Sequence, residues 1–236
     1  MSRIRLMRRL ARRNPPLIMP WTLRRQGLLG MNQRNGDYIM RYNQRRFYPL
    51  VDDKLRTKQL AMDAGIAVPE LLGVIEIEHQ VRDLADMLGG RTDFVIKPAQ
   101  GSGGNGIMVI AGRRAGRYIR ASGVVATNDD IQHFVSNILS GMYSLGGLPD
   151  KAMIEYRVKP HPVFDAVSHQ GVPDIRTIVF RGVPVAAMVR LPTRQSDGKA
   201  NLHQGAVGAG VDLLTGRTLD GVWLNRVINE HPDSGR

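Results

Sequence analysis

The sequence contains no cysteine, which excludes disulfide bridges, thiolate zinc sites and a cysteine nucleophile. It also lacks an apolar run near the roughly 18 residues that a membrane-spanning helix requires. We therefore expect no transmembrane segment. The absence of cysteine is compatible with a reducing compartment, and we predict a cytoplasmic protein.

Acidic residues are scarce at the start of the chain. Residues 1–46 contain twelve arginines and one acid, Asp37, while the remaining 190 residues contain 21 basic and 20 acidic side chains. Nearly all of the net charge of +12 therefore lies in a basic N-terminal arm. Residues 1–13 predict a short amphipathic helix. Such an arm is solvated or packed, or it binds an anionic partner such as a membrane, RNA or an acidic protein. A mitochondrial transit peptide is also Arg-rich, but the usual serines are missing here.

The body of the chain has a globular composition, with 42% hydrophobic and 23% charged residues overall. Its patterns alternate between helix and strand. Residues 52–65 predict a helix that Gly65 closes, with an apolar side made of Leu55, Leu60, Ala61 and Ala64. We expect further helices at 80–88 and 129–140, and strands at 71–77, 94–96, 107–110, 152–158, 175–180 and 185–191.

A glycine-rich segment lies between two strand-like runs, with the sequence Gln100-Gly101-Ser102-Gly103-Gly104-Asn105-Gly106. Without Cβ atoms, its backbone N–H groups can approach an anion closely, which indicates a phosphate site. A strand follows instead of a helix, which excludes the dinucleotide fingerprint, and Ile107 stands where a P-loop has lysine. A protein-kinase loop needs its lysine on a later strand, whereas Lys97 precedes this loop. Two interpretations remain: a hairpin that closes over a phosphate chain beside Lys97, or a mobile hairpin with an exposed lysine.

Further motifs occur on both sides of this loop. Before it stand the segments YPLVDDK, residues 48–54, TK, residues 57–58, and GIAVP, residues 65–69; after it come IEYRV at 154–158, DIR at 174–176, AAMVR at 186–190 and KANLHQG at 199–205. In this order the motifs resemble the ATP-grasp ligases, and within them the alpha-L-glutamate ligase (RimK-like) group. The resemblance extends from about Leu23 to the C-terminus.

The resemblance implies an α+β ATP-grasp fold, in which two lobes hold a nucleotide between them. The basic arm would cover 1–46, the N-terminal lobe 47–150, and a C-terminal lobe, incomplete here, 151–236. It implies ATP and Mg²⁺ as cofactors. The implied reaction forms an amide through an acylphosphate, joining glutamate or another amino acid to a peptide or small molecule.

The resemblance also implies roles for individual residues. Arg176 and Arg190 would be catalytic, steadying the acylphosphate and orienting the acid. The nucleotide would be bound by Lys54, Lys97, Gln100, Gly101, Ser102, Gly103, Gly104, Gly106, Glu155, Tyr156, Val158, Asp174, Lys199 and Asn201.

Simpler interpretations of these residues stay open. Lys54 could be a charge at a helix N-terminus, and Glu155 a solvent-facing acid on a strand. Asp174 and Arg176, two residues apart on a strand, could form an exposed ion pair. Asn201 could be a turn residue, and the nearby His203 a structural histidine.

The chain departs from the family in two places. Only about 46 residues precede the core, where members carry a globular domain, and the late Asp…Glu-x-Asn segment that holds Mg²⁺ is missing. We therefore expect weak or absent catalysis from this chain alone and assign no metal ligands. A non-catalytic nucleotide-binding protein, or a nucleic-acid or membrane-binding protein acting through residues 1–46, stays an alternative. The sequence does not indicate an oligomeric state.

Overall fold

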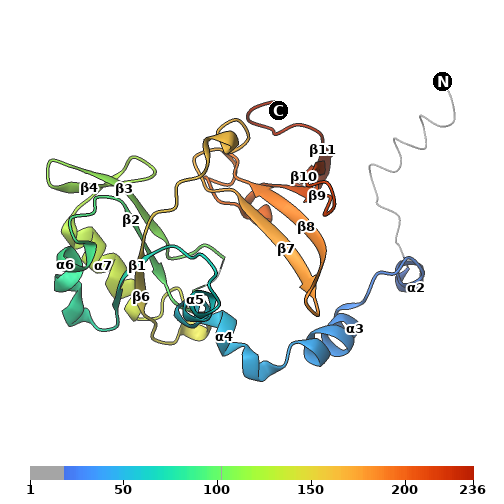
Figure 1. The fold of residues 1–236 in the computed structure, drawn as a ribbon, viewed down its shortest axis with the longest axis horizontal. Helices are drawn as coiled ribbons and strands as arrows, with labels where there is room; N and C mark the ends of the chain where they lie inside the picture. The colour runs from blue at the N-terminus through green and yellow to red at the C-terminus, as the bar shows by residue number, and fades with distance from the viewer. Residues whose placement is uncertain (1–18, 102) are drawn as a thin grey trace. The chain divides into compact units, whose positions relative to one another are not determined.

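The computed structural model describes residues 19–101 and 103–236 (Figure 1). The chain divides into two compact units, Met1–Pro49 and Leu50–Arg236. The helix predicted at residues 1–13 lies outside the described residues. From residue 19 to 49 the first unit consists of short helices and no residue is buried. These helices are α2 (Pro20–Arg25), α3 (Met31–Gln33), a π-helix (Arg34–Met40) and a 3₁₀ helix (Arg45–Phe47).

Two helices follow, α4 (Pro49–Asp52) and α5 (Lys54–Asp63). Asp53 caps α5, because its carboxylate accepts hydrogen bonds from the backbone N–H groups of Leu55 at 2.9 Å and Arg56 at 3.3 Å. The predicted helix is thus confirmed, but its predicted apolar side is wrong. Leu60 is 48% exposed, and the buried residue of α5 is Lys58.

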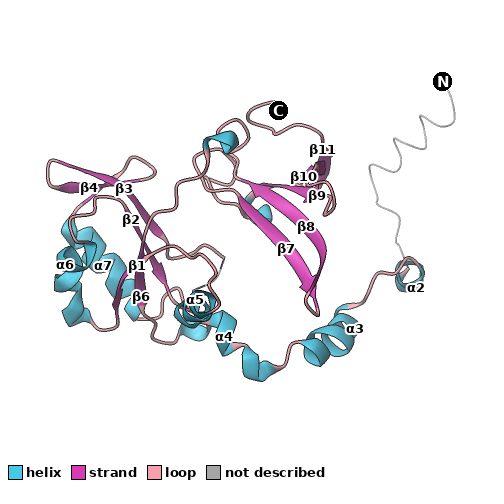
Figure 2. Ribbon diagram, in the orientation of Figure 1, coloured by secondary structure: helices cyan, strands magenta, loops and turns pink. Residues whose placement is uncertain are grey.

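The first sheet has six strands in the order β1-β6-β2-β3-β4-β5, and each neighbouring pair is antiparallel (Figure 2). The strands are β1 (Leu71–Ile75), β2 (Phe94–Pro98), β3 (Met108–Arg114), β4 (Arg117–Arg120), β5 (Val125–Ala126) and β6 (Ala152–Glu155). The pairing of β2 with β3 confirms that the glycine-rich segment sits in a hairpin. β6 belongs to this sheet although it lies beyond residue 150, where the sequence predicts the end of the N-terminal lobe.

Helices cover one face of the first sheet. α7 (Asn128–Leu139) buries Ile131, Val135 and Ile138, which follow the helical period, and it contacts β2, β5 and β6. The helix predicted at 80–88 begins as a 3₁₀ helix (Glu78–Asp83) and continues as α6 (Leu84–Leu88). On β2, burial alternates along the strand, with Phe94, Ile96 and Pro98 buried. The side chain of Lys97 therefore lies on the other face of the sheet, away from this core.

The second sheet has five antiparallel strands in the order β11-β10-β9-β8-β7. They are β7 (Asp174–Phe180), β8 (Val183–Leu191), β9 (Val207–Val211), β10 (Thr218–Trp223) and β11 (Arg226–Ile228). Arg181 and Gly182 form the predicted turn between β7 and β8, and both have positive φ angles.

The helices and antiparallel sheets together make the α+β fold that the sequence predicts. Within the described ranges 19–101 and 103–236, the helices are too short or too polar to span a membrane.

Candidate functional site

Strand register brings Glu155 and Lys97 together on the first sheet. Glu155 of β6 stands opposite Val95 of β2, so it is the diagonal neighbour of Lys97 on the same face. The carboxylate of Glu155 forms an ion pair with the ammonium of Lys97. Glu155 is only 3% exposed, which contradicts its interpretation as a solvent-facing acid. A buried carboxylate needs such compensation, because an isolated charge is very costly inside a protein.

Helix α5 supplies a second cation to Glu155. Lys58, which is 7% exposed, places its Nζ 2.7 Å from Glu155 Oε1 and also donates a hydrogen bond to the carbonyl of Pro69. Removing one partner of a buried ion pair typically costs about 3–5 kcal/mol. Sequence reasoning included Lys58 in an ATP-grasp motif but gave it no role, although lysines at 54 and 58 are one helical turn apart and face the same way.

Lys54, at the first position of α5, holds the base of the glycine loop. Its ammonium donates to the carbonyl of Ala99 at 3.1 Å and to that of Gly101, and its backbone N–H also donates to Ala99. Burial lowers the pKa of Lys54, and the nearby positive charge of Lys97 lowers it further. Two ammonium groups that are close enough to repel each other create a local positive charge, which a phosphate anion would neutralise.

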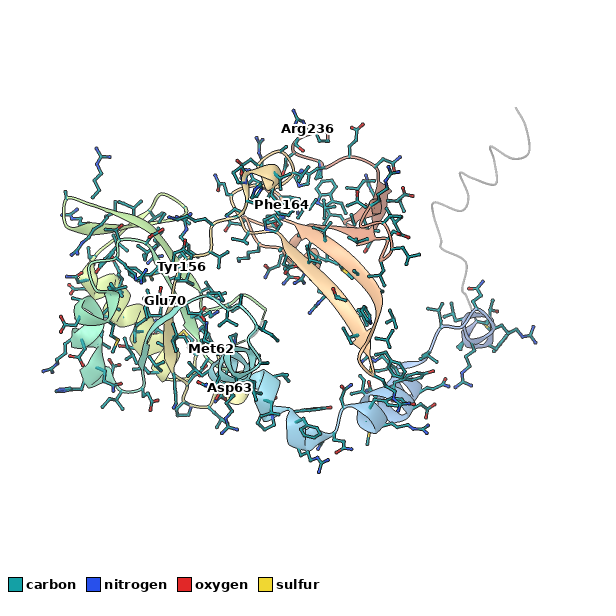
Figure 3. All side chains as sticks on the ribbon, viewed as in Figure 1. Met62, Asp63, Glu70, Tyr156, Phe164 and Arg236 are labelled. Atoms are coloured by element: carbon teal, nitrogen blue, oxygen red, sulfur yellow. The ribbon has the colours of Figure 1, made fainter. Side chains whose placement is uncertain are left out.

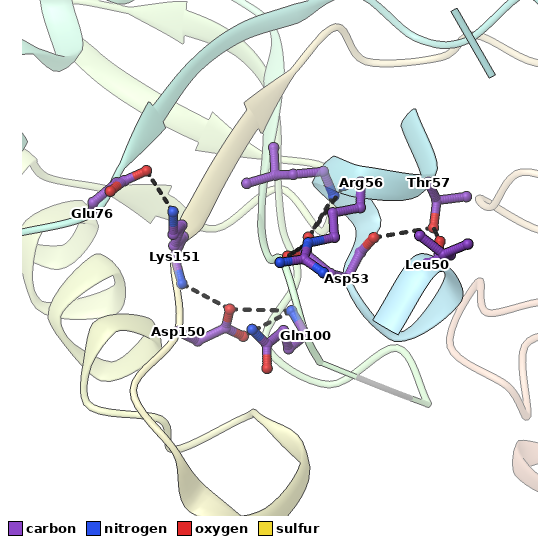
Figure 4. A network of polar contacts seen from close by, with 9 residues as sticks. Leu50, Asp53, Arg56, Thr57, Glu76, Gln100, Asp150 and Lys151 are labelled. Carbon is purple, nitrogen blue, oxygen red and sulfur yellow. Dashed lines mark hydrogen bonds and ion pairs between the residues drawn. The ribbon is translucent and has the colours of Figure 1, made fainter. Parts of the chain in front are cut away.

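A buried acid fixes the strand ends beneath the loop (Figure 4). The carboxylate of Asp150, 5% exposed, accepts hydrogen bonds from the backbone N–H groups of Gln100, at 2.9 and 3.1 Å, and Lys151, at 2.7 Å. The side chain of Lys151 pairs with Glu76 at 2.7 Å. The backbone N–H of Gln100 is therefore already used within the protein. Asp150 is a residue that sequence reasoning missed, because no local pattern marks it.

The glycine loop is anchored at its ends and open in its middle. Gly101 forms an isolated bridge with Ser144. At Gly106, φ is +69° and an added Cβ would lie 2.5 Å from the ring of Tyr143, so only glycine fits. Gly103 and Gly104 are exposed and have positive φ angles. Ser102, predicted to bind nucleotide, lies outside the described residues.

Tyr156 and Val158 lie just beyond β6, because the strand ends at Glu155, earlier than predicted. The backbone N–H of Tyr156 donates to the carbonyl of Glu70 at 2.8 Å, and Figure 3 labels both residues. Val158 is 43% exposed. Tyr156 therefore connects the segment that follows β6 to the residue just before β1.

The remaining predicted residues belong to the second sheet. Asp174 stands directly opposite Arg190 in the register of β7 and β8. The guanidinium of Arg190 donates through Nε, at 2.6 Å, and through a terminal nitrogen to the two carboxylate oxygens. This hydrogen bonding raises the pKa of Arg190. The simpler interpretation of Asp174 and Arg176 as an ion pair is therefore wrong, because the partner of Asp174 comes from the next strand. Arg176 is exposed and, among the described residues, forms no ion pair.

Lys199 and Asn201 lie in the loop between β8 and β9. Asn201 accepts a hydrogen bond from the backbone N–H of His203 at 3.1 Å and caps the 3₁₀ helix Leu202–Gln204, which supports its turn interpretation. Lys199 and His203 are exposed, so His203 is not a core residue. Thr193, fully buried, donates to the carbonyl of Gly205 at 2.7 Å and ties the two ends of this loop together.

The side of the second sheet opposite Asp174 and Arg190 carries an apolar cavity of about 410 Å³. Ile175, Val189 and Ala209 line it and follow one another across β7, β8 and β9. Since side chains alternate between faces, Asp174 and Arg190 face away from this cavity. The polar and apolar faces of the sheet are thus distinct.

No three histidine, aspartate or glutamate side chains within residues 19–101 and 103–236 are grouped so as to hold a metal ion. The described residues therefore do not mark a protein-held magnesium site. A magnesium ion that binds with nucleotide phosphates needs only one or two carboxylates, so the magnesium expectation stays a prediction.

The structure thus assembles Lys54, Lys58, Lys97 and Glu155 with the glycine loop, and it separately pairs Asp174 with Arg190. Comparison with known families finds that residues 33–236 match the family described as sugar-transfer associated ATP-grasp. The match confirms the ATP-grasp superfamily, while the resemblance to alpha-L-glutamate ligases is not confirmed. No curated protein matches the sequence significantly.

Proposed function

Because the chain belongs to the sugar-transfer associated ATP-grasp family, we propose that it binds ATP at the lysine cluster and joins a carboxylate to an amine. The family implies ATP-dependent chemistry of the ligase type. In the proposed reaction, a carboxylate oxygen attacks the γ-phosphorus and ADP leaves. The amine nitrogen then attacks the acyl carbon of the acylphosphate, phosphate departs with the electrons of the C–O bond, and the amine loses a proton. Glutamate or another amino acid is the proposed substrate, acting with a peptide or small molecule.

The observation that carries this proposal is the meeting of Lys54, Lys97 and the glycine loop. Lys54 bonds to the carbonyl of Gly101, at the start of the loop, while the partly exposed Lys97 lies close enough to lower the pKa of Lys54. An attacking carboxylate and a triphosphate are both anions. Positive side chains and backbone N–H groups must therefore neutralise charge as it develops.

The two arginines have different proposed tasks. Arg176 is exposed and free of ion pairs among the described residues, so its guanidinium is available to an acylphosphate oxygen. Arg190 uses Nε and one terminal nitrogen for Asp174, which leaves the other terminal nitrogen for a substrate oxygen. Asp174 holds that guanidinium in a fixed orientation.

We predict that Lys97→Ala lowers the rate of ADP formation about a hundredfold, by analogy with the loss of an oxyanion donor. ADP release is measured with ATP, Mg²⁺ and a panel of amino acids. Lys151→Ala is the matched control, because this lysine is half-exposed and pairs with Glu76 on the same sheet.

Binding is measured separately, so that a slow enzyme is distinguished from a chain without a nucleotide site. A non-hydrolysable ATP analogue at 100 times its Kd should stabilise the folded chain by about 2.7 kcal/mol. A Lys97→Ala chain that is stabilised as strongly as the wild type, or that turns over within about threefold of it, would contradict the assignment.

A further inference from the structure

The two lysines that share Glu155 differ in their freedom to move. Lys58 is almost fully buried and is held by two partners, the Glu155 carboxylate and the Pro69 carbonyl. The side chain of Lys97 is 23% exposed. Lys97 is therefore the member of this trio that can turn toward a ligand, while Lys58 stays with the carboxylate.

We propose that Lys58 is a positioning residue for nucleotide binding: it neutralises Glu155, so that Lys97 can exchange that carboxylate for a nucleotide phosphate. This inference rests on the proposed function, since it assumes that a nucleotide binds at Lys97. It assigns Lys58 a role through Glu155 and Lys97, without contact with the ligand.

The argument follows from the charges in the buried cluster. When both lysines contact Glu155, the cluster carries one excess positive charge. When Lys97 turns to a phosphate, Lys58 and Glu155 remain as a neutral pair. Without the charge of Lys58, the same movement would leave a buried carboxylate unpaired, which is strongly unfavourable. Lys97 would then be held by Glu155, and a phosphate would have to compete for it.

Other nearby groups do not replace Lys58. The ammonium of Lys54 is engaged by the carbonyls of Ala99 and Gly101. The carboxylates of Asp53 and Asp150, which lie near enough to Lys54 to affect its pKa, carry the same sign as Glu155. Lys58 is thus the cation that remains with Glu155 after Lys97 moves.

A purely structural role predicts a different result. Lys58 also connects α5 to the chain before β1 through the Pro69 carbonyl. If this connection were its whole contribution, losing Lys58 would lower the melting temperature and leave the affinity of the folded chain for nucleotide unchanged. The dependence of affinity on Glu155 therefore separates the two roles.

The experiment measures the affinity of the full chain for a non-hydrolysable ATP analogue by calorimetry, together with the melting temperature. The variants are Lys58→Gln, Glu155→Gln and the double variant, because glutamine keeps a hydrogen-bond donor and removes only the charge at position 58. Lys58→Arg tests rescue by a residue that keeps the charge. Lys151→Gln is the control, since it removes a half-exposed lysine from an ion pair between the residues next to β1 and β6.

We expect Lys58→Gln to weaken binding about tenfold in the wild-type chain and less than about threefold in the Glu155→Gln chain, because coupled residues are not additive. Lys58→Arg and Lys151→Gln should stay within about threefold of the wild type. An equal loss in both backgrounds, or a lower melting temperature with unchanged affinity, would overturn the proposal.

If the Lys58→Gln chain does not fold, the proposal is tested by comparing the Glu155→Gln chain with the double variant, because neither of them buries an unpaired carboxylate. A further loss of about tenfold from Lys58→Gln in that background would overturn the proposal, and a loss below about threefold would support it. A wild-type chain without affinity for the analogue would overturn the proposed function, and this inference with it. Wild-type binding with no effect of Lys58→Gln overturns the inference alone.

Discussion

Lys54 occupies a position that helix stability does not explain. A lysine in the first turn of a helix faces the positive end of the helix dipole. Its side chain instead bonds to the Ala99 and Gly101 carbonyls, where burial and then Lys97 lower its pKa below the usual 10.5, against the opposing effects of Asp150, Asp53 and Glu155. Between the lowered pKa of Lys54 in the folded chain and 10.5, Lys54 is more fully protonated in the unfolded chain than in the folded one. The contribution of Lys54 to stability therefore rises with pH in that window.

We predict that nucleotide binding takes up a proton at alkaline pH. A bound phosphate favours the ammonium form and raises the pKa of Lys54 again, whereas the free chain begins to lose this proton below 10.5. Affinity should therefore fall as pH rises through the lowered pKa of the free chain. Calorimetry in two buffers with different ionisation enthalpies measures the proton uptake.

The matched variant for this prediction is Lys54→Arg, which stays charged over the whole range. Its affinity should depend less on pH than that of the wild type. The same alkaline proton uptake in both chains would show that another group titrates.

At the residue scale, sequence reasoning identified single cations better than their partners. Lys97 is marked by its place on a strand before the glycine loop, and Lys54 by the motif that resembles the ATP-grasp ligases; both lie at the glycine loop. Glu155 and Lys97 were both selected, but their pairing was not predicted, and Lys58 was given no role. A pair such as Lys58 and Glu155 is separated by almost one hundred residues, so only the folded chain shows it.

At the element scale, α7 covers the face of the first sheet opposite Lys97. Its N-terminus has a capping box: the Oγ1 of Thr127 accepts from the backbone N–H of Asp130 at 3.1 Å, and the Asp130 carboxylate accepts from that of Thr127 at 2.8 Å. The hydrogen bonds that the Asp130 carboxylate accepts from the backbone N–H and the hydroxyl of Thr127 lower the pKa of Asp130.

We predict that Thr127→Ala destabilises the chain by about 1 kcal/mol, the usual cost of losing an N-cap. For a chain of this size, the melting temperature should fall by roughly 2–4 °C. Thr92→Ala is the control, because Thr92 is exposed and its side chain makes no hydrogen bond within the described part of the chain. A Thr127→Ala chain with the same melting temperature as the wild type would contradict the role of the cap.

Element type was predictable where the local pattern is strong. α7 agrees within a residue or two with the helix predicted at 129–140, because its apolar residues follow the helical period. α5 was found from the helical pattern of residues 52–65 and its end at Gly65, but its buried side was misjudged. Ionic contacts, not apolar periodicity, determine which side of α5 is buried. The strand predicted at 152–158 ends early, because β6 needs β1 and β2 on its two sides, and the register with them ends at Glu155.

At the scale of the whole molecule, the excess positive charge and the proposed nucleotide site belong to different units. The residues of the lysine cluster lie in Leu50–Arg236, whereas most of the net charge lies in Met1–Pro49. Between residues 19 and 49 large apolar side chains such as Trp21, Met31 and Met40 are exposed beside arginines. An anionic partner for the arm, independent of the nucleotide, therefore stays a prediction beside a solvated or packed arm.

We predict that deleting residues 1–30 leaves nucleotide affinity within about threefold of the full chain, because every residue of the lysine cluster belongs to the other unit, Leu50–Arg236. The deletion removes eight of the twelve arginines of the arm. Retention on a phosphate-bearing resin should therefore fall and depend less on salt. A tenfold loss of nucleotide affinity would show that the arm contributes to the site.

The sequence by itself determined the glycine hairpin, the lysine before it and, through motifs that resemble those of the ATP-grasp ligases, the superfamily with its α+β class and Lys54. The hairpin depends on turn residues and hydrophobic period, and the resemblance on the order of motifs, all of which are local or linear properties of the chain. The tertiary structure decided that Glu155 is shared by Lys58 and Lys97, that Asp150 anchors the loop, and that Asp174 pairs with Arg190. Each of these contacts depends on strand register or helix placement. A slip of one residue in register would turn every side chain of a strand to the other face.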